Sequence, residues 1–534
     1  PATPEGATPP PAPQPKRNAF TRFLDAVEWL GNLLPHPVTL FALLALGMVL
    51  LSGLFGALGL AVEDPRPVGA SGRAEDGMIR AVSLMTEDGL RRIFTSLVEN
   101  FTSFAPLGVV LVAMLGVGVA ERSGLLSAAV RGTVLAAPKN LVTFIIVFAG
   151  IMSNIASEMG YVVLIPLAGA VYYSLGRHPL AGMAAAFAGV SGGYAANLLI
   201  GTIDPLLAGI TQEAARLIDP DYTVAVTASW YFMAASVPMI ALIGTLVSTY
   251  IVEPKIGPYD PKVADPEVLK GSSLNPLEAK EKKGLWAAGL AMLALFAVMA
   301  LTLWPEGALL RDPETGDRLR SPFFTGFVTW IFLFFIVVGF AYGRVAGTMK
   351  NDKDVIDGMS SAISTLGLYV VIVFFAAQFV AFFGWSNIGA LTAVTGANFL
   401  EASGLTGPAI FIGFILICCL VNLTIGSSSA QWAMTSPIFV PMLMLVGYSP
   451  ELIATAYRIG DSTTNIITPM MSYFGLILAW AVRYDRNVGI GTMIAMMLPY
   501  SIFFTIGWAL LFFVWVFGLG LPVGPGSPTY YSLG

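Results

Sequence analysis

Long apolar segments restrict the fold of this sequence more than any other feature, because each is long enough to cross a lipid bilayer. A membrane-spanning helix needs about 20 predominantly apolar residues. Segments that meet this requirement are 38–62, 104–120, 180–210, 226–252, 284–304, 323–343, 363–385, 450–482 and 490–518. Hydrophobic residues make up 56% of the 534-residue chain and charged residues 11%, which excludes an ordinary soluble domain. The sequence therefore predicts an all-α polytopic membrane protein with nine transmembrane helices.

Two further apolar stretches, 141–175 and 408–447, are each interrupted midway by small and polar residues, at 153–160 and at 422–431. Irregular backbone at membrane depth is tolerated only where protein or a water-filled cavity satisfies its polar groups. We therefore expect each stretch to form a re-entrant helical hairpin.

The distribution of positive charge predicts the orientation. With these nine crossings, the side that carries the N-terminus holds about twice as many Lys and Arg residues as the other side. Positive residues accumulate on the cytoplasmic side, so we expect a cytoplasmic N-terminus. The two hairpins are then separated by an odd number of crossings and enter from opposite faces, as an inverted repeat requires.

The polar residues of the two halves also repeat in sequence. Some matches occur at a spacing of 268 residues and others at 271, and they are Asn154 with Asn422, Asn197 with Asn465, Gly192 with Gly460, Pro166 with Pro437, Gly176 with Gly447 and Pro179 with Pro450. Chance is the alternative explanation, since these residue types are common. We favour an inverted duplication, because the hairpin positions and the topology agree with the matches.

This repeat predicts a division of the chain into six parts. They are a disordered, Pro-rich N-terminal tail (1–25), scaffold helices (26–122), the first hairpin and a broken helix of a transport domain (123–212), scaffold helices and loops (213–362), the second hairpin and broken helix of the transport domain (363–488), and a scaffold helix with the C-terminal tail (489–534).

Ser, Thr and Asn residues cluster at the hairpin tips and at the breaks, with few carboxylates nearby. Neutral oxygens and freed carbonyls suit a small monovalent cation such as Na⁺, whereas Ca²⁺ would need several carboxylates. We expect ion coupling to involve Asn154, Asn197, Asp204, Asp461 and Asn465, and a bound Na⁺ to lie near Asn154, Asn197, Asn422 and Asn465. No other cofactor is predicted. The alternative is that these side chains only link helices by hydrogen bonds.

Arg458 is the one cation that falls inside an apolar segment, and Asp461 lies three residues later on the same helical face, which Asn465 continues. Such a residue is costly in a membrane and suggests a function. Arg458 could bind a substrate carboxylate, with Asp461 holding it or carrying a coupling proton; the alternative is a structural ion pair between them. Asp204 is the corresponding carboxylate of the first half. Trp432, after the second hairpin tip, could stack on an aromatic ring or simply pack.

Other classes of function find little support in the sequence. There is no GxxxxGK[ST] motif for ATP, no zinc-binding histidine pattern and no basic stripe for nucleic acid. An intramembrane aspartyl protease would need carboxylates that share a proton, which Arg458 opposes. A channel remains an alternative that accumulation against a gradient would exclude.

Three motifs resemble the AbgT family of bacterial inner-membrane transporters, which is associated with p-aminobenzoyl-glutamate uptake and sulfonamide export. They are SSSAQWA at 427–433, YRIGDSTTNIITP at 457–469 and GTIDPLL at 201–207. The resemblance implies a bowl-shaped homodimer with scaffold and transport parts. It also implies functional roles for Asp204 and for the substrate-binding residues Asn422, Ser429, Trp432, Pro450, Arg458, Asp461 and Pro469.

We therefore expect a multi-pass protein of the bacterial inner membrane that transports a small anionic aromatic substrate, p-aminobenzoyl-glutamate or a related folate-pathway or sulfonamide compound, driven by Na⁺ or protons. The expected partners are the lipid bilayer and a second copy of the chain, and not nucleic acid; no enzyme activity is expected. A dicarboxylate:sodium symporter is the alternative, because paired polar hairpins also resemble those carriers.

Overall fold

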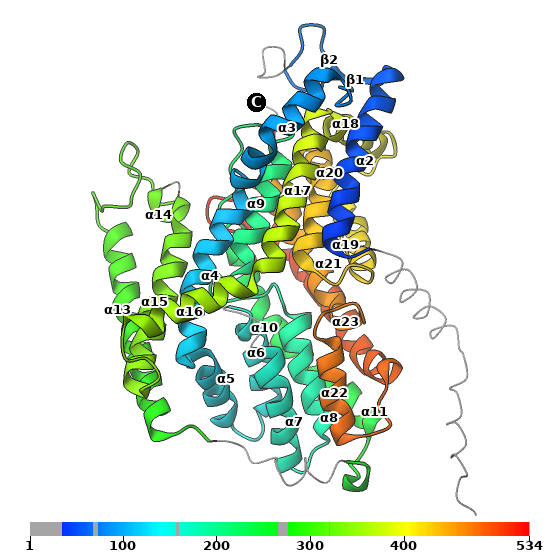
Figure 1. The fold of residues 1–534 in the computed structure, drawn as a ribbon. Coiled ribbons are helices and arrows are strands. Elements are labelled where there is room, and N and C mark those ends of the chain that lie inside the picture. Colours follow the sequence, from blue (N-terminus) through cyan, green and yellow to red (C-terminus); the bar gives the residue numbers. More distant parts are fainter. Residues whose placement is uncertain (1–34, 68–72, 156–159, 265–275, 320, 533–534) are drawn as a thin grey trace, which may run out of the picture.

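The computed structural model describes residues 35–67, 73–155, 160–264, 276–319 and 321–532 (Figure 1). The predicted N-terminal tail, and two polar residues of the first hairpin tip, Ser157 and Glu158, lie outside these ranges. The described chain is mainly helical, as predicted. Its strands are two three-residue segments, β1 (Ala61–Glu63) and β2 (Met78–Arg80), which pair antiparallel.

The helices fall into two series that follow the same order. The first series consists of α3 (Glu87–Thr102), α4 (Ala105–Ser123), α5 (Leu125–Leu135), α6 (Val142–Ser153), α7 (Ile165–Ser174), α8 (Pro179–Phe187), α9 (Ile203–Ala215) and α10 (Trp230–Val247). The second consists of α16 (Asp352–Thr365), α17 (Gly367–Trp385), α18 (Ile388–Ala402), α19 (Ile410–Asn422), α20 (Ser428–Leu445), α21 (Pro450–Thr464), α22 (Phe474–Tyr484) and α23 (Ile490–Phe512).

Further helices flank or extend these two series. They are α2 (Pro37–Ala57), α11 (Glu253–Ile256), α13 (Ala279–Leu303), α14 (Pro322–Thr325), α15 (Phe327–Ala346), the π-helical turns η1 (Gly160–Leu164), η2 (Ala188–Gly192), η3 (Ser248–Val252) and η5 (Phe513–Gly518), and the 3₁₀ turn η4 (Pro261–Val263). Helix α2, which precedes the first series, packs on α17 of the second series. Helix α15, which precedes the second series, packs on α4 of the first.

Within the described residues, seven helical segments are long and apolar enough to cross a membrane, and each overlaps one of the nine predicted spans. The two remaining predicted spans, 180–210 and 450–482, are each divided in two. The first is unwound between η2 and α9, and the second between α21 and α22. Both divisions lie where the sequence predicted a break.

The predicted hairpins are interrupted at the expected places. Helix α6 ends at Ser153 and η1 begins at Gly160, while α19 ends at Asn422 and α20 begins at Ser428. Helices α6 and α7 lie in the lower half of the molecule and α19 and α20 in the upper half (Figure 1). The structure therefore places the two helix pairs toward opposite ends of the fold.

The turns before the two broken helices confirm part of the predicted repeat. Gly176 and Gly447 both have positive φ, a conformation that glycine adopts without steric cost. Pro179 and Pro450 are each the first residue of the next helix, where the missing N–H of proline costs nothing. These two sequence matches are therefore structurally equivalent.

Close packing of glycines shows how the repeat continues, and it corrects one predicted match. The Cα of Gly189 lies against the main-chain carbonyl of Val147, and a Cβ on Gly460 would lie 2.7 Å from the carbonyl oxygen of Ile415. Val147 and Ile415 occupy equivalent places in α6 and α19. The structural counterpart of Gly460 is thus Gly189 and not Gly192, which faces Phe504 and Ile466.

Candidate functional site

The two broken helices meet at a buried ion pair. The Arg458 side chain on α21 donates from Nη1 to Oδ1 of Asp204 on α9, and both residues are buried. The other oxygen of Asp204, Oδ2, accepts a hydrogen bond of 2.7 Å from the main-chain N–H of Gly201. The ion-pair partner of Arg458 is therefore Asp204 in the other half of the chain, and not Asp461, with which the alternative interpretation of the sequence paired it.

Local sequence explains why Asp204 can hold this position. Helix α9 starts at Ile203, directly after the unwound segment, so Asp204 lies in its first turn. A carboxylate is stabilised there by the unpaired N–H groups and the positive end of the helix dipole. Asp204 therefore holds the unwound segment at Gly201 and neutralises Arg458 with the same side chain.

Asp461 lies one turn beyond Arg458, and its carboxylate is fully buried. Neither of its oxygens has a hydrogen-bond partner among the described residues. Three other side-chain oxygens of the second hairpin also lack partners in that part of the chain: Asn422 Oδ1 at the end of α19, and Ser428 Oγ and Gln431 Oε1 in the first turn of α20. Buried polar atoms are nearly always paired in folded proteins, so this group of oxygens is suited to a cation or a proton.

Asn422 connects the hairpin tip to α21. Its Nδ2 lies 2.6 Å from the main-chain carbonyl oxygen of Asp461 and 2.9 Å from both Thr464 Oγ1 and Asn465 Oδ1. The first half repeats this link, because Asn154 Nδ2 donates to the carbonyl of Val190 over 2.8 Å. The match between Asn154 and Asn422 is therefore structural as well as sequential.

Asn197 is not placed as the repeat predicted. Its side chain accepts a local hydrogen bond of 3.2 Å from the Leu199 N–H in the unwound segment. Among the described residues it has no hydrogen bond to Asn154, whereas its proposed counterpart Asn465 is bonded to Asn422. The structure brings Asn422, Asp461 and Asn465 together and leaves Asn197 outside this group.

Trp432 is completely buried on α20. Its ring stacks on Tyr457, with ring centres 4.2 Å apart, and its Nε1 donates to Thr211 Oγ1 on α9 over 2.9 Å. In this conformation Tyr457 already occupies one face of the tryptophan. Tyr457 and Thr211 were missed by the sequence reasoning, although Thr211 lies two helical turns after Asp204 and therefore on the same face of α9.

The remaining predicted residues frame this region. Ser429 lies in the first turn of α20, where its hydroxyl is 3.4 Å from that of Ser427. Pro450 is the first residue of α21, and Pro469 lies in the unwound segment before α22. These residues define where the helices begin and end around the buried charges.

A cavity of about 860 Å³ lies alongside α9. It is lined by Pro205, which follows Asp204, and by Glu451 in the first turn of α21. Glu451 Oε2 accepts a hydrogen bond of 2.8 Å from the hydroxyl of Tyr222. The cavity thus contacts both helices that contribute the ion pair.

A repeated, polytopic helical fold with polar breaks and buried charges defines a membrane transport protein. The comparisons with known proteins identify its family. The profile of the AbgT putative transporter family matches residues 22–531. The "p-aminobenzoyl-glutamate transport protein" of Escherichia coli K12 is 36% identical over 501 residues, which cover 94% of this chain and 95% of that protein.

Two solved structures agree with this assignment. MtrF of Neisseria gonorrhoeae, described as illuminating a class of antimetabolite efflux pumps, is 58% identical with a TM-score of 0.89, covering 95% of this chain and 100% of its own. The YdaH transporter of Alcanivorax borkumensis is 45% identical with a TM-score of 0.84, covering 92% and 100%. The chain belongs to the AbgT family. It is a multi-pass membrane transporter and not an enzyme.

Proposed function

We propose that this transporter moves p-aminobenzoyl-glutamate and related folate-pathway or sulfonamide compounds across the bacterial inner membrane, driven by a gradient of Na⁺ or protons. The names of the E. coli relative and of MtrF support the substrate class. The observation that carries the proposal is the ion pair of Arg458 with Asp204, because a substrate carboxylate can replace Asp204 on the guanidinium.

Substrate binding would use the fork geometry of Arg458. A guanidinium binds a carboxylate through two parallel hydrogen bonds. One of its groups, Nε, has no partner among the described residues and is therefore an additional donor. A glutamate carboxylate that approaches Arg458 would release Asp204 and loosen the contact between α9 and α21. Asn422, Ser429, Trp432, Pro450 and Pro469 are proposed to shape the substrate site, with the Trp432 and Tyr457 stack adjusting to admit the aromatic ring.

Ion coupling would use the second buried carboxylate. Asp461 can be neutralised either by a proton or by Na⁺, and the unpaired oxygens of Asn422, Ser428 and Gln431 are ligands that Na⁺ accepts. Asn465 would support this site through Asn422. Asn154 is proposed to serve the corresponding role in the first half. Asn197, which lies outside the equivalent group, is proposed to take part in ion coupling from the unwound segment. Substrate and ion would then occupy the same helix, one turn apart, so that occupation of one site influences the other.

The proposed membrane arrangement has nine crossings, a cytoplasmic N-terminus and hairpins that enter from opposite faces. The opposite placement of the two helix pairs supports this arrangement (Figure 1). The hairpins and broken helices would form the transport domain, moving against scaffold helices in a homodimer, as the family resemblance implies. The names of the relatives favour an aromatic amide over the dicarboxylate alternative.

Transport by purified protein in liposomes tests the proposal. Labelled p-aminobenzoyl-glutamate and labelled succinate would be compared while Na⁺ and pH gradients are imposed separately, in both directions. We expect the aromatic amide to accumulate against its gradient, and Asp461→Asn to remove the dependence on the coupling ion. Accumulation of succinate alone, or equilibration without accumulation, would contradict the proposal.

A further inference from the structure

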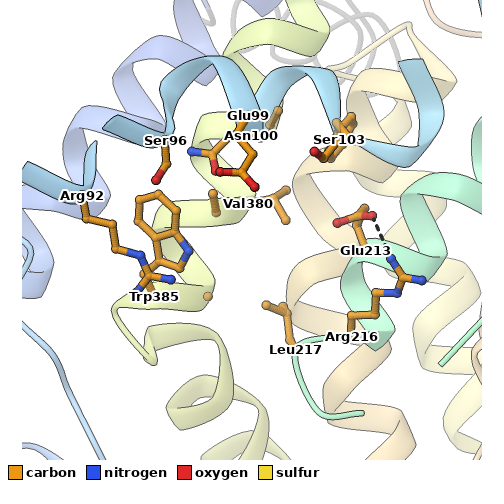
Figure 2. Close-up of a pocket in the computed structure, with 14 residues that line it drawn as sticks. Arg92, Ser96, Glu99, Asn100, Ser103, Glu213, Arg216, Leu217, Val380 and Trp385 are labelled. Atoms are coloured by element: carbon orange, nitrogen blue, oxygen red, sulfur yellow. Dashed lines mark ion pairs between the residues drawn. The ribbon is translucent and has the colours of Figure 1, made fainter. Parts of the chain in front are cut away.

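Two cavities adjoin α9, and their charged side chains differ. The pocket of about 420 Å³ between α3, the end of α9 and α17 contains both signs of charge, with Arg216 lying 3.7 Å from Glu213 (Figure 2). The cavity of about 860 Å³ lies beside earlier residues of α9, and the charged side chains among its described lining residues are Glu451 and Asp312. Both volumes suit a small molecule. The larger cavity is the one suited to a group that donates hydrogen bonds.

Glu451 is the buried carboxylate of this cavity. It lies in the first turn of α21, is 5% exposed, and accepts a hydrogen bond of 2.8 Å from the hydroxyl of Tyr222. No Lys or Arg of the described chain lies within ion-pair distance of it. A carboxylate buried in a predicted span is costly and suggests a function. Asp312 already accepts hydrogen bonds from Glu314 and Thr315 in its own loop. Glu451, with one hydrogen bond, retains capacity to accept others from a ligand.

The position of Glu451 on α21 relates it to Arg458. The two residues are seven apart, which places them about 10 Å apart along the helix and on nearly the same face. Arg458 is bonded to Asp204, and Glu451 lines a cavity whose wall includes the next residue, Pro205. Helix α21 thus presents a cation and a hydrogen-bond acceptor toward α9 and the segment that follows it, about two helical turns apart.

The compounds of the proposed function share one donor group. p-Aminobenzoyl-glutamate carries an aryl amine at one end and carboxylates at the other, and the amine lies about 9–10 Å from the nearer carboxylate by standard bond lengths. p-Aminobenzenesulfonamides carry the same aryl amine but no carboxylate. Arg458 therefore accounts for binding of the first class alone. A site that accepts both classes requires an acceptor for the amine.

We infer that Glu451 binds the aryl amine and makes the transporter specific for p-amino aromatic compounds, an inference that rests on the proposed function. The amine N–H donates to the Glu451 carboxylate from within the cavity. The carboxylates of a glutamate conjugate then point along α21 toward Arg458, where one of them replaces Asp204. A hydrogen bond to a charged acceptor contributes more than one between neutral groups, so the amine is a strong determinant of selectivity.

A series of ligands tests this assignment on the wild-type protein. Isothermal titration calorimetry of the purified transporter in detergent would compare p-aminobenzoyl-glutamate with benzoyl-glutamate, p-methoxybenzoyl-glutamate and p-dimethylaminobenzoyl-glutamate. The last two keep an electron-donating substituent on the ring but have no N–H at that position. We expect all three to bind about tenfold or more weakly than the amine, because the charge-assisted hydrogen bond is lost. Equal affinity of p-aminobenzoyl-glutamate and p-methoxybenzoyl-glutamate would overturn the assignment.

Matched variants locate the acceptor. Glu451→Gln should weaken p-aminobenzoyl-glutamate and p-aminobenzenesulfonamide by about tenfold and leave benzoyl-glutamate unchanged. The new amide oxygen can still accept the hydrogen bond from Tyr222, so this contact of α21 is retained. Glu401→Gln, an exposed change at the end of α18, is the control and should bind every ligand as the wild type does. An equal loss of benzoyl-glutamate in Glu451→Gln would show a purely structural role and overturn the assignment.

A further variant separates this inference from the proposed function. Asp204→Asn combined with Arg458→Gln keeps Glu451 but lacks the guanidinium that binds carboxylates. Once its folding is verified by thermal unfolding, it should lose affinity for p-aminobenzoyl-glutamate and retain affinity for p-aminobenzenesulfonamide. Loss of both ligands would show that amine recognition depends on the ion pair and would overturn the assignment to Glu451. If the wild type bound no p-aminobenzoyl-glutamate, the proposed function would fail as well, whereas equal binding of the amine and methoxy ligands would refute this inference alone.

Discussion

Arg458 and Asp204 are bonded to each other although they are 254 positions apart, and each belongs to the broken helix of a different half of the chain. Asp204 is further held by the N–H of Gly201, in the unwound segment that precedes α9. The charge of the arginine is therefore neutralised only while α9 and α21 remain together. Any ligand that takes the place of Asp204 also changes the contact between the two repeats.

Removal of one partner should cost more than removal of both. Arg458→Gln or Asp204→Asn leaves an unpaired buried charge, with an expected loss of about 3–5 kcal/mol, whereas the double variant should recover most of that loss. Thermal unfolding in detergent, followed by tryptophan fluorescence, measures the difference. We expect all three variants to lose transport. Each lacks either the Arg458 guanidinium that binds the substrate or the Asp204 carboxylate that the substrate displaces.

The exposed pair of Arg91 with Glu87 provides the comparison. Arg91→Gln should change stability by less than about 1 kcal/mol, since exposed ion pairs contribute little. Unchanged stability in both single variants of the buried pair would mean that the pair is not formed in the resting transporter.

Neutralisation of Asp461 should preserve the fold and remove the response to the coupling ion. Asp461→Asn has nearly the same shape and avoids an unpaired buried carboxylate, so thermal stability should be equal to or greater than that of the wild type. An ion that binds the folded state raises its stability, by about 2.7 kcal/mol at one hundred times the dissociation constant. The melting temperature would be measured in NaCl against choline chloride, and across pH.

The melting temperature of the wild-type protein should depend either on Na⁺ or on pH, and that of Asp461→Asn should depend on neither. Glu306→Gln, a change in an exposed loop, is the control and should respond like the wild type. An undiminished ion response in Asp461→Asn would place the coupling ion elsewhere.

The paired glycines of the repeat should tolerate no side chain. Gly189 and Gly460 lie against main-chain carbonyls of the preceding hairpin helix, so Gly189→Ala and Gly460→Ala should each destabilise by roughly 1–3 kcal/mol through overpacking. Gly413→Ala is the control in α19, because a Cβ there meets nothing within 4 Å. This control should gain up to about 1 kcal/mol from better helix propensity. Equal behaviour of the three variants, measured by thermal unfolding, would contradict the close packing.

Features that depend on local sequence were predicted well. The spans, the interruptions near Asn154 and Asn422, and the turns at Gly176 and Gly447 follow from apolar length, small polar residues and glycine before proline. Each of these signals acts within a few residues of the structure it determines, and a single sequence contains it completely.

Features that depend on which elements meet were predicted poorly. Arg458 had two candidate carboxylates, and helical spacing favoured Asp461. The structure shows that the two residues have different neighbours, since the Arg458 side chain contacts α9 while the main-chain carbonyl of Asp461 accepts a hydrogen bond from Asn422 at the end of α19. Similarly, no motif reports that Tyr457 stacks on Trp432, or that residues of α3, α9 and α17 enclose one pocket. These relationships arise from tertiary packing and have no signature in the local sequence.

The turn before α8 should make stability depend on pH. His178 caps this helix by accepting a hydrogen bond of 3.3 Å at Nδ1 from the N–H of Leu180, and its ring packs edgewise on Tyr259, with centres 4.9 Å apart. Burial lowers the pKa of His178 below its ordinary value of 6.5, although the charge of Asp485 opposes this shift. A protonated Nδ1 cannot accept the hydrogen bond.

For a base with a lowered pKa, the unfolded state binds protons first as the pH falls, so stability is fully present above about pH 6.5 and declines below it. Between pH 7.5 and 5.5, the wild type should lose about 1 kcal/mol more than His178→Asn, which keeps a capping side chain that does not titrate. Thermal unfolding at the two pH values gives this difference. Glu306→Gln, a change in an exposed loop, is the control and should keep the wild-type pH response, because an exposed glutamate stays ionised over this range. The same response in His178→Asn would show that other groups cause it.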